Sequence, residues 1–307
     1  MSDSKHYNDY GTWIRSMFPF RVQKISINAG FSCPNRDGRI GQGGCIYCDN
    51  RTFNPSYCNS TSSIKAQLEE GKKFFSHKYP DMKFLAYFQA YTNTYESIDK
   101  LKHMYEEALS VEDVIGIVIG TRPDCVSDEL LDYLGHLNTQ TFITIEYGIE
   151  TANNNTLKLI NRGHDFECVK RIVSKTAEKG IITGGHIILG LPGEDSEEII
   201  RQAPLISALP INILKLHQLQ VIHGTKLEQM YKEHPFHLFS PDEYIELIGR
   251  YIKLLRKDIV IERFTSQSPK DMLVGPQWGM KNHEFTDKLM KYLRENNIYQ
   301  GQDVILP

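Results

Sequence analysis

The sequence predicts an α/β fold, namely a partial, TIM-like (β/α)6 barrel followed by a small C-terminal α/β extension. Strand-like and helix-like patterns alternate through six units of roughly 30 to 40 residues, which is typical of parallel strands joined by right-handed crossovers. The β-branched run 114–119 suits a strand buried on both faces. Polar and glycine-rich residues follow the strands, where barrels of this class carry their chemistry.

The elements are expected in this order along the chain. Strands are predicted at 22–29, 84–90, 114–119, 142–147, 185–189 and 211–221, from alternating or β-rich stretches. Helices are predicted at 64–78, 95–109, 154–160, 168–179 and 194–208, from helical spacing of apolar residues. A further helix should begin after Ser127, a suitable N-cap followed by two acidic residues, and Gly180 suits a helix C-cap.

The regular alternation of strand-like and helix-like patterns ends at about residue 231. Helices are expected at 241–257 and 282–295, with a strand at 259–264 and a loop rich in Gln, Pro, Gly and Trp after it. This loop, around residues 273–280, either covers the open mouth of the barrel or packs against the rest of the protein. The chain is therefore divided into an N-terminal extension (1–21), a barrel core (22–231) and a C-terminal extension packed on the barrel (232–307).

Composition narrows the class of protein. The formal net charge of −3 gives no overall field that would attract nucleic acid or a membrane, although a local basic patch stays open. No apolar run approaches the ~20 residues of a membrane span, and the first residues lack a signal-peptide core, so a cytoplasmic protein is expected. Three of the six cysteines are isolated and three are clustered, which favours metal or redox chemistry in a reducing compartment.

The segment 251–294 has a modestly basic composition. It holds nine Lys or Arg residues against five Asp or Glu residues, interleaved with aromatic side chains. This composition fits a nucleic-acid patch, and it equally fits two solvated helix faces.

The clustered cysteines are the strongest chemical signal. Cys33, Cys45 and Cys48 are spaced as Cys-x11-Cys-x2-Cys, directly after the first predicted strand. Three thiolates can hold an iron–sulfur cluster with one iron left open, whereas a structural zinc site needs a fourth ligand, for which Cys58 is the nearest candidate. Unrelated thiols on a surface loop are a third interpretation.

At these residues the chain resembles the radical-SAM superfamily. Most members carry Cys-x3-Cys-x2-Cys, but the segments 30–38 and 43–48 resemble a bacterial subgroup with a longer loop, itself similar to the catalytic subunit of Elongator. Other fragments agree and follow predicted strands in order: Thr-Arg-Pro-Asp (121–124), Asn-Arg-Gly-His (161–164) and His-Ile-Ile-Leu-Gly-Leu-Pro-Gly (186–193). The resemblance covers roughly residues 22–231 and is expected to extend to the C-terminus.

The resemblance implies a [4Fe–4S] cluster bound by Cys33, Cys45 and Cys48, with S-adenosylmethionine (SAM) on the open iron. Reduction of SAM would give methionine and a 5′-deoxyadenosyl radical, which takes a hydrogen atom from the substrate. The cofactor pair supplies the difficult chemistry, and the protein supplies orientation and a dry cavity.

The same resemblance gives individual residues candidate roles. Tyr47 would lie near the adenine, or would merely cover the loop. Glu150 would meet the ribose or amino group of SAM, or would be a solvated acid. Arg162 would bind the methionine carboxylate through its bidentate fork, or would be a surface arginine. Further cofactor contacts are expected from residues at the ends of strands, namely Gln89, Thr121 and Gly148.

Four other residues carry weaker expectations. His186 is a candidate SAM contact or a core histidine, and Gly190 is expected to let the backbone approach the adenine or to form a tight turn. Lys215 and His217 should point from the sixth strand toward the cavity, as substrate contacts or as part of a structural ion pair.

By similarity to the Elongator-like group, the expected substrate is a tRNA base, a wobble uridine or its side chain, with a flavodoxin or ferredoxin as reductant. Two alternatives remain. One is a small-molecule oxidoreductase resembling oxygen-independent coproporphyrinogen oxidase, and the other is a zinc-binding nucleic-acid module without catalysis.

Overall fold

The fold is a seven-stranded parallel half-barrel, shown by a computed structural model that describes residues 5–76 and 81–304. Neighbouring strands in the sheet follow chain order, and every pair is parallel. The strands are β1 (Arg21–Ile27), β2 (Met82–Phe88), β3 (Val114–Thr121), β4 (Phe142–Glu150), β5 (Ile182–Leu189), β6 (Ile213–Gln218) and β8 (Val260–Arg263). The predicted α/β class is confirmed, and the seventh strand comes from the C-terminal extension.

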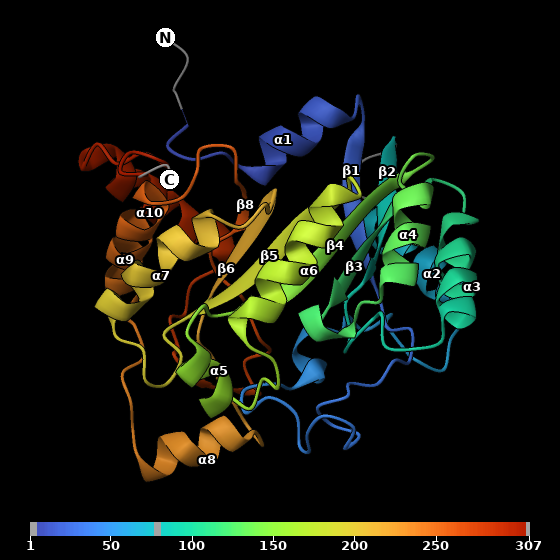
Figure 1. Cartoon of the computed structure of the whole chain (residues 1–307). Helices are drawn as coiled ribbons and strands as arrows, with labels where there is room; N and C mark the ends of the chain where they lie inside the picture. Colours follow the sequence, from blue (N-terminus) through green and yellow to red (C-terminus); the bar gives the residue numbers. More distant parts are fainter. Residues whose placement is uncertain (1–4, 77–80, 305–307) are drawn as a thin grey trace.

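Helices cover the outer face of the sheet (Figure 1). They are α2 (Ile64–Ser76), α3 (Ile98–Leu109), α4 (Asp128–Leu137), α5 (Asn154–Leu159), α6 (Phe166–Glu178) and α7 (Ser196–Ser207). The predicted N-cap is confirmed, because the Ser127 hydroxyl accepts a hydrogen bond from the Leu130 N–H at 3.1 Å. The predicted end of the first helix, Lys78, lies outside the described residues. Within 5–76 and 81–304, none of the helices combines the length and apolarity that crossing a bilayer requires.

The predicted strand 211–221 is two strands in the structure. The backbone leaves the main sheet after β6, and β7 (Val221–Ile222) pairs antiparallel with β9 (Leu273–Gly275). The loop 273–280 is therefore tied down by pairing. Trp278 stacks on Phe285 at 5.4 Å and donates its Nε1–H to the Phe239 carbonyl, so this partly buried side chain packs against the core of the protein.

Two helices were not expected from the sequence, and two others belong to the C-terminal region. α1 (Tyr10–Met17) lies at one end of the sheet and α8 (Lys226–Glu233) at the opposite end (Figure 1). α9 (Pro241–Lys253) stops four residues before its predicted end, and α10 (Asn282–Glu295) matches its prediction.

The two ends of the half-barrel carry different kinds of side chain, aromatic at one end and polar at the other. At the amino ends of the strands, Phe142 meets Phe18 at 5.4 Å and Trp13 at 6.5 Å, so aromatic rings from the N-terminal segment pack against the start of β4. The N-terminal segment also covers the sheet edge at β8, where the Ile261 N–H donates to the Asn8 carbonyl at 2.8 Å. The carboxyl ends of the strands carry polar residues, and the candidate site lies there.

Candidate functional site

A cavity of about 160 Å³ lies at the carboxyl ends of the strands. Its walls include most of the residues singled out from the sequence: Cys33, Cys45, Tyr47, Cys48, Gln89, Thr121, Gly148, Glu150, Arg162, His186 and His217. A second compartment of about 150 Å³ shares Tyr47, Cys48, Glu150 and both histidines, and it continues along the residues that follow β6. The fold therefore brings together the cysteine loop that follows β1 and residues on or after β2 through β6, which are far apart in the sequence.

The long cysteine spacer folds back on itself. Asp37 and Gln42 form an antiparallel bridge, and the Gly38 N–H donates to the Gly41 carbonyl. Where this loop begins and ends, the Arg36 N–H donates to the Cys33 carbonyl at 2.8 Å and the Gly44 N–H donates to the Asn35 carbonyl at 2.8 Å. The eleven residues between Cys33 and Cys45 thus form a closed side loop that returns the chain to the cavity.

Nitrogen donors surround the cysteine sulfurs. Arg162 Nη1 lies 3.5 Å from Cys45 Sγ, and Asn35 Nδ2 lies 3.6 Å from the same sulfur. Asn50 Nδ2 lies 3.6 Å from Cys48 Sγ. Hydrogen bonds of this kind stabilise thiolates and tune the reduction potential of iron–sulfur clusters, so this donor set fits a cluster bound to thiolates.

The thiol of Cys48 needs a positive partner to ionise. Burial, followed by the nearby Cys45, raises the pKa of Cys48 to about 11. A bound metal supplies the charge that deprotonates such a thiol. In the described part of the chain, no three His, Cys, Asp or Glu residues meet closely enough to share one metal ion. A four-iron cluster instead distributes its thiolates over separate irons.

Cys58 is engaged elsewhere. Its thiol donates to the Ser26 carbonyl at 2.9 Å, and burial raises its pKa to about 12. It does not line the cavity that contains the other three cysteines. The fourth ligand that a zinc site would take from Cys58 is therefore committed to the backbone of β1.

Arg162 and Glu150 lie beside the cysteines. Arg162 Nη2 donates to the Gly148 carbonyl at 2.6 Å and lies 3.3 Å from Glu150 Oε1, while the Arg162 Nε is buried without a partner. Glu150 has a φ of 68°, a conformation that costs energy for a residue with a side chain. Arg162 is thus a buried cation in the cavity wall, and the interpretation of a surface arginine is wrong.

Sequence reasoning missed several residues of the site. Arg122 lines the cavity, is paired with Asp124 at 2.8 Å, and donates to the Arg162 carbonyl at 2.7 Å. Asn35, Arg36 and Asn50 also lie around the cysteines. The Thr-Arg-Pro-Asp fragment was the available signal for Arg122, whereas contacts of the two asparagines depend on loop folding that no local pattern encodes.

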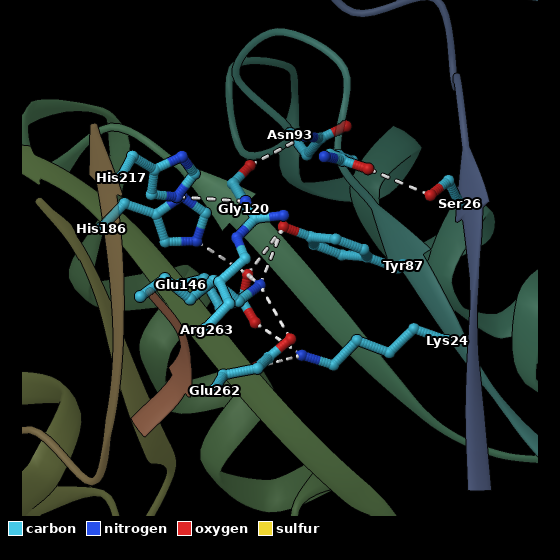
Figure 2. Close-up of polar contacts among 12 residues, drawn as sticks. Lys24, Ser26, Tyr87, Asn93, Gly120, Glu146, His186, His217, Glu262 and Arg263 are labelled. Carbon is cyan, nitrogen blue, oxygen red and sulfur yellow. Dashed lines mark hydrogen bonds and ion pairs between the residues drawn. The ribbon is translucent and has the colours of Figure 1, made fainter. Parts of the chain in front are cut away.

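One wall of this cavity continues into a connected set of buried charged and polar residues that we call the charged floor, composed of Lys24, Tyr87, Glu146, Lys215 and Glu262. Figure 2 shows Lys24, Tyr87, Glu146 and Glu262 pointing toward one another. Glu146 Oε2 accepts from Lys215 Nζ at 2.6 Å and from the Tyr87 hydroxyl at 2.7 Å, and Oε1 accepts from Lys24 Nζ at 2.9 Å. Burial alone would raise the pKa of Glu146, but Lys215 and Lys24 hold it well below its usual range. Lys215 therefore belongs to an ion pair within the charged floor.

The two histidines stand between the cavity and the floor. His186 Nε2 lies 3.0 Å from Glu146 Oε2, and the ring of His217 stacks on that of His186 at 5.5 Å. Burial lowers the pKa of both imidazoles, helped by Lys215 for His186 and by Arg263 for His217. Both rings are consequently neutral at physiological pH. Gly190 lines neither compartment, and a Cβ on it would meet the Phe239 ring at 3.0 Å.

Family models match most of the chain. The model described as the radical SAM superfamily matches residues 33–202, and the radical SAM C-terminal domain matches residues 211–295. The chain is 34% identical to the uncharacterized protein YtqA of Bacillus subtilis, over 97% of this chain and 92% of that protein.

More distant similarities concern a tRNA-related enzyme. The chain is 24% identical to a tRNA uridine(34) acetyltransferase of Methanocaldococcus infernus, over 63% of this chain and 36% of that protein. The solved structure of Elp3 from the same organism superposes with a TM-score of 0.67 at 18% identity, covering 92% of this chain and 64% of that one. The latter match shows a shared fold.

Proposed function

Because the chain belongs to the radical SAM superfamily, whose enzymes use a [4Fe–4S] cluster and SAM, we propose that it modifies a tRNA base, namely a wobble uridine or its side chain. The observation that carries the substrate proposal is the similarity to a tRNA uridine(34) acetyltransferase, which covers 63% of this chain. The zinc-binding module without catalysis is set aside, since the family consists of enzymes.

The residues of the cavity have distinct tasks in this proposal. Cys33, Cys45 and Cys48 hold the cluster, and the nitrogen donors around them stabilise the thiolates. Arg162 lines the cavity as a buried cation whose Nε has no partner, which suits the carboxylate of SAM. When bound, the cofactor pair supplies a 5′-deoxyadenosyl radical that abstracts a hydrogen atom from the substrate.

The rest of the barrel limits what reaches this radical. Aromatic rings pack against Phe142 at the amino end, whereas the cavity lies at the carboxyl ends of the strands, which is where we propose that substrate enters. The neutral rings of His186 and His217 face the cavity without adding charge. A flavodoxin or ferredoxin is the proposed electron donor, and the cytoplasm, where tRNA is found, is the proposed location.

The test is mass spectrometry of tRNA nucleosides from a strain that lacks this gene. We expect one wobble-uridine derivative to disappear and its precursor to accumulate, with rescue by the wild-type gene and not by Cys45→Ala. An unchanged nucleoside profile would contradict the proposal and would point to a small-molecule substrate. A salt-dependent gel shift with tRNA gives an independent measure of binding.

A further inference from the structure

The last strand of the sheet contains an irregularity that turns two consecutive charged side chains inward. β8 pairs with β6 as Leu214↔Ile261 and then as Lys215↔Arg263, so Glu262 is an extra residue in the ladder. Consecutive side chains on a regular strand point to opposite faces. A bulge re-aims a side chain, and here both Glu262 and Arg263 reach the barrel interior (Figure 2).

The two carboxylates of the charged floor are already occupied by lysines. Glu262 Oε2 lies 2.6 Å from Lys24 Nζ, and Glu262 Oε1 lies 3.3 Å from Lys215 Nζ. The carboxylate of Glu146 contacts the same two ammonium groups. Adding Arg263 gives three cations against two carboxylates inside the barrel. In the described ranges, Arg263 makes no ion pair with an acidic side chain.

Arg263 is held in place by a neutral group. Its Nη2 lies 3.1 Å from His217 Nε2, and its Nε is buried without a hydrogen-bond partner. Because burial and Arg263 itself keep His217 unprotonated, the imidazole accepts a hydrogen bond but cannot offset the charge of the guanidinium. A largely enclosed cation that lacks an anion is costly, and a ligand anion removes that cost.

The position of Arg263 indicates which ligand could reach it. Arg263, His186 and His217 line the same cavity as the three cysteines, and Arg122 and Arg162 lie in its wall with carboxylate partners of their own. Arg263 differs from these two arginines because its charge has no such partner. The remaining N–H donors of its planar fork suit two oxygens of one oxyanion.

We propose that Arg263, oriented by His217, binds an anionic oxygen group of the substrate, a carboxylate or a phosphate, in the cavity that the cysteines line. This inference rests on the proposed function only in requiring that the substrate enters this cavity. The anion would anchor the substrate at β8, across the half-barrel from the cysteine loop, and so fix which C–H bond faces the radical. Specificity would then follow from the distance between the anion and the reacting carbon.

The test is equilibrium dialysis of the anaerobic holoenzyme, with SAM present at saturation, against labelled acetate and labelled inorganic phosphate. We expect one of the two probes to bind saturably at one site per chain. Arg263→Gln should weaken this binding at least tenfold, and Arg263→Lys by about threefold, because a lysine keeps the charge but loses the fork. Arg201→Gln removes an exposed arginine paired with Glu198 and should bind like the wild type.

Each outcome has a defined meaning. Binding of acetate identifies a carboxylate on the substrate, and binding of phosphate identifies a nucleotide phosphate. Absence of saturable binding, or binding by Arg263→Gln within twofold of the wild type, would overturn the proposal. Binding that vanishes when SAM is added would also overturn it, because Arg263 would then serve the cofactor. Since no tRNA is used, this result is independent of the nucleoside experiment.

Discussion

The surroundings of the cysteines and the charged floor use similar residue types, but they differ in how their buried groups are paired. In the floor, Glu146 accepts from two lysines, a tyrosine and a histidine. Around the cysteines, buried atoms of Asn35, Arg122 and Arg162 have no partner. Buried polar groups are normally satisfied, so the unpaired set around the cysteines supports the proposed ligand site, whereas we interpret the paired set as scaffold.

The largest effect should come from removing a cluster ligand. Cys45→Ala should abolish SAM cleavage to 5′-deoxyadenosine and deplete protein-bound iron, because two thiolates cannot hold the cluster with an open iron. The measurement is product formation with a chemical reductant, together with iron and sulfide analysis.

Cys58→Ala is the matched control for this change. Its thiol contacts the Ser26 carbonyl and lies outside the cavity, so cleavage should stay within about twofold of the wild type. Survival of cleavage in Cys45→Ala, or its loss in Cys58→Ala, would contradict the assignment of the ligands.

Much of the fold could be predicted from the sequence because its signals are local. The run at β3 and the cap at Ser127 encode their own conformations. β7 and β9 have two and three residues, which is too short for any periodicity, and they exist through pairing with each other. The inward turn of Arg263 depends on a register shift against β6, which only the assembled sheet reveals.

The residues of the site also divide into those that a local sequence pattern indicates and those that only the assembled fold brings together. The spacing of the cysteines is visible in the sequence, as is the Asn-Arg-Gly-His fragment that contains Arg162. The partners of Lys215 lie 69 residues away on β4 and on the neighbouring strand β8, so a structural ion pair could be expected from the sequence but its partners could not. Gly190 shows the opposite case, because its fragment resembles a cofactor contact while the residue lines neither compartment of the site.

The second largest effect tests the floor as scaffold. Lys215→Met removes a buried cation and leaves Glu146 and Glu262 short of a partner, which should lower the free energy of unfolding by about 3 kcal/mol. Lys175→Met removes a surface ion pair with Asp128 and should cost less than about 1 kcal/mol. Anaerobic urea unfolding compares the two variants, and equal losses would show that the floor is not structurally important.

A smaller effect tests the unpaired set. Arg162→Lys keeps the charge but loses the fork, so it should weaken SAM binding about tenfold, in line with the loss of one hydrogen bond to a charged group. Arg51→Lys changes an exposed arginine paired with Asp49 and should leave SAM affinity unchanged. Equal affinity in Arg162→Lys and the wild type, measured by calorimetry, would remove Arg162 from the SAM site.

The smallest effect concerns an unpaired atom outside both regions. Burial, followed by Arg162, lowers the pKa of His164 from 6.5 to about 3, and its Nε2 has no partner. The unfolded chain therefore binds a proton at this histidine below pH 6.5 while the folded chain does not, and stability falls as the pH falls. Between pH 7.5 and 5.5 this should cost about 1.4 kcal/mol.

His164→Asn should be less sensitive to acid by that amount. Urea unfolding at the two pH values checks the difference. An identical loss in the variant and the wild type would show that His164 does not remain neutral in the folded protein.

The most direct test of the unpaired set as a ligand site is electron paramagnetic resonance of the anaerobically reduced protein, recorded before and after addition of SAM. The account predicts the signal of a reduced [4Fe–4S] cluster whose g values shift when SAM binds the open iron. It also predicts that Arg162→Gln needs more SAM to produce the same shift. A cluster signal that SAM leaves unchanged, or the absence of a cluster signal in iron-loaded wild-type protein, would contradict the account.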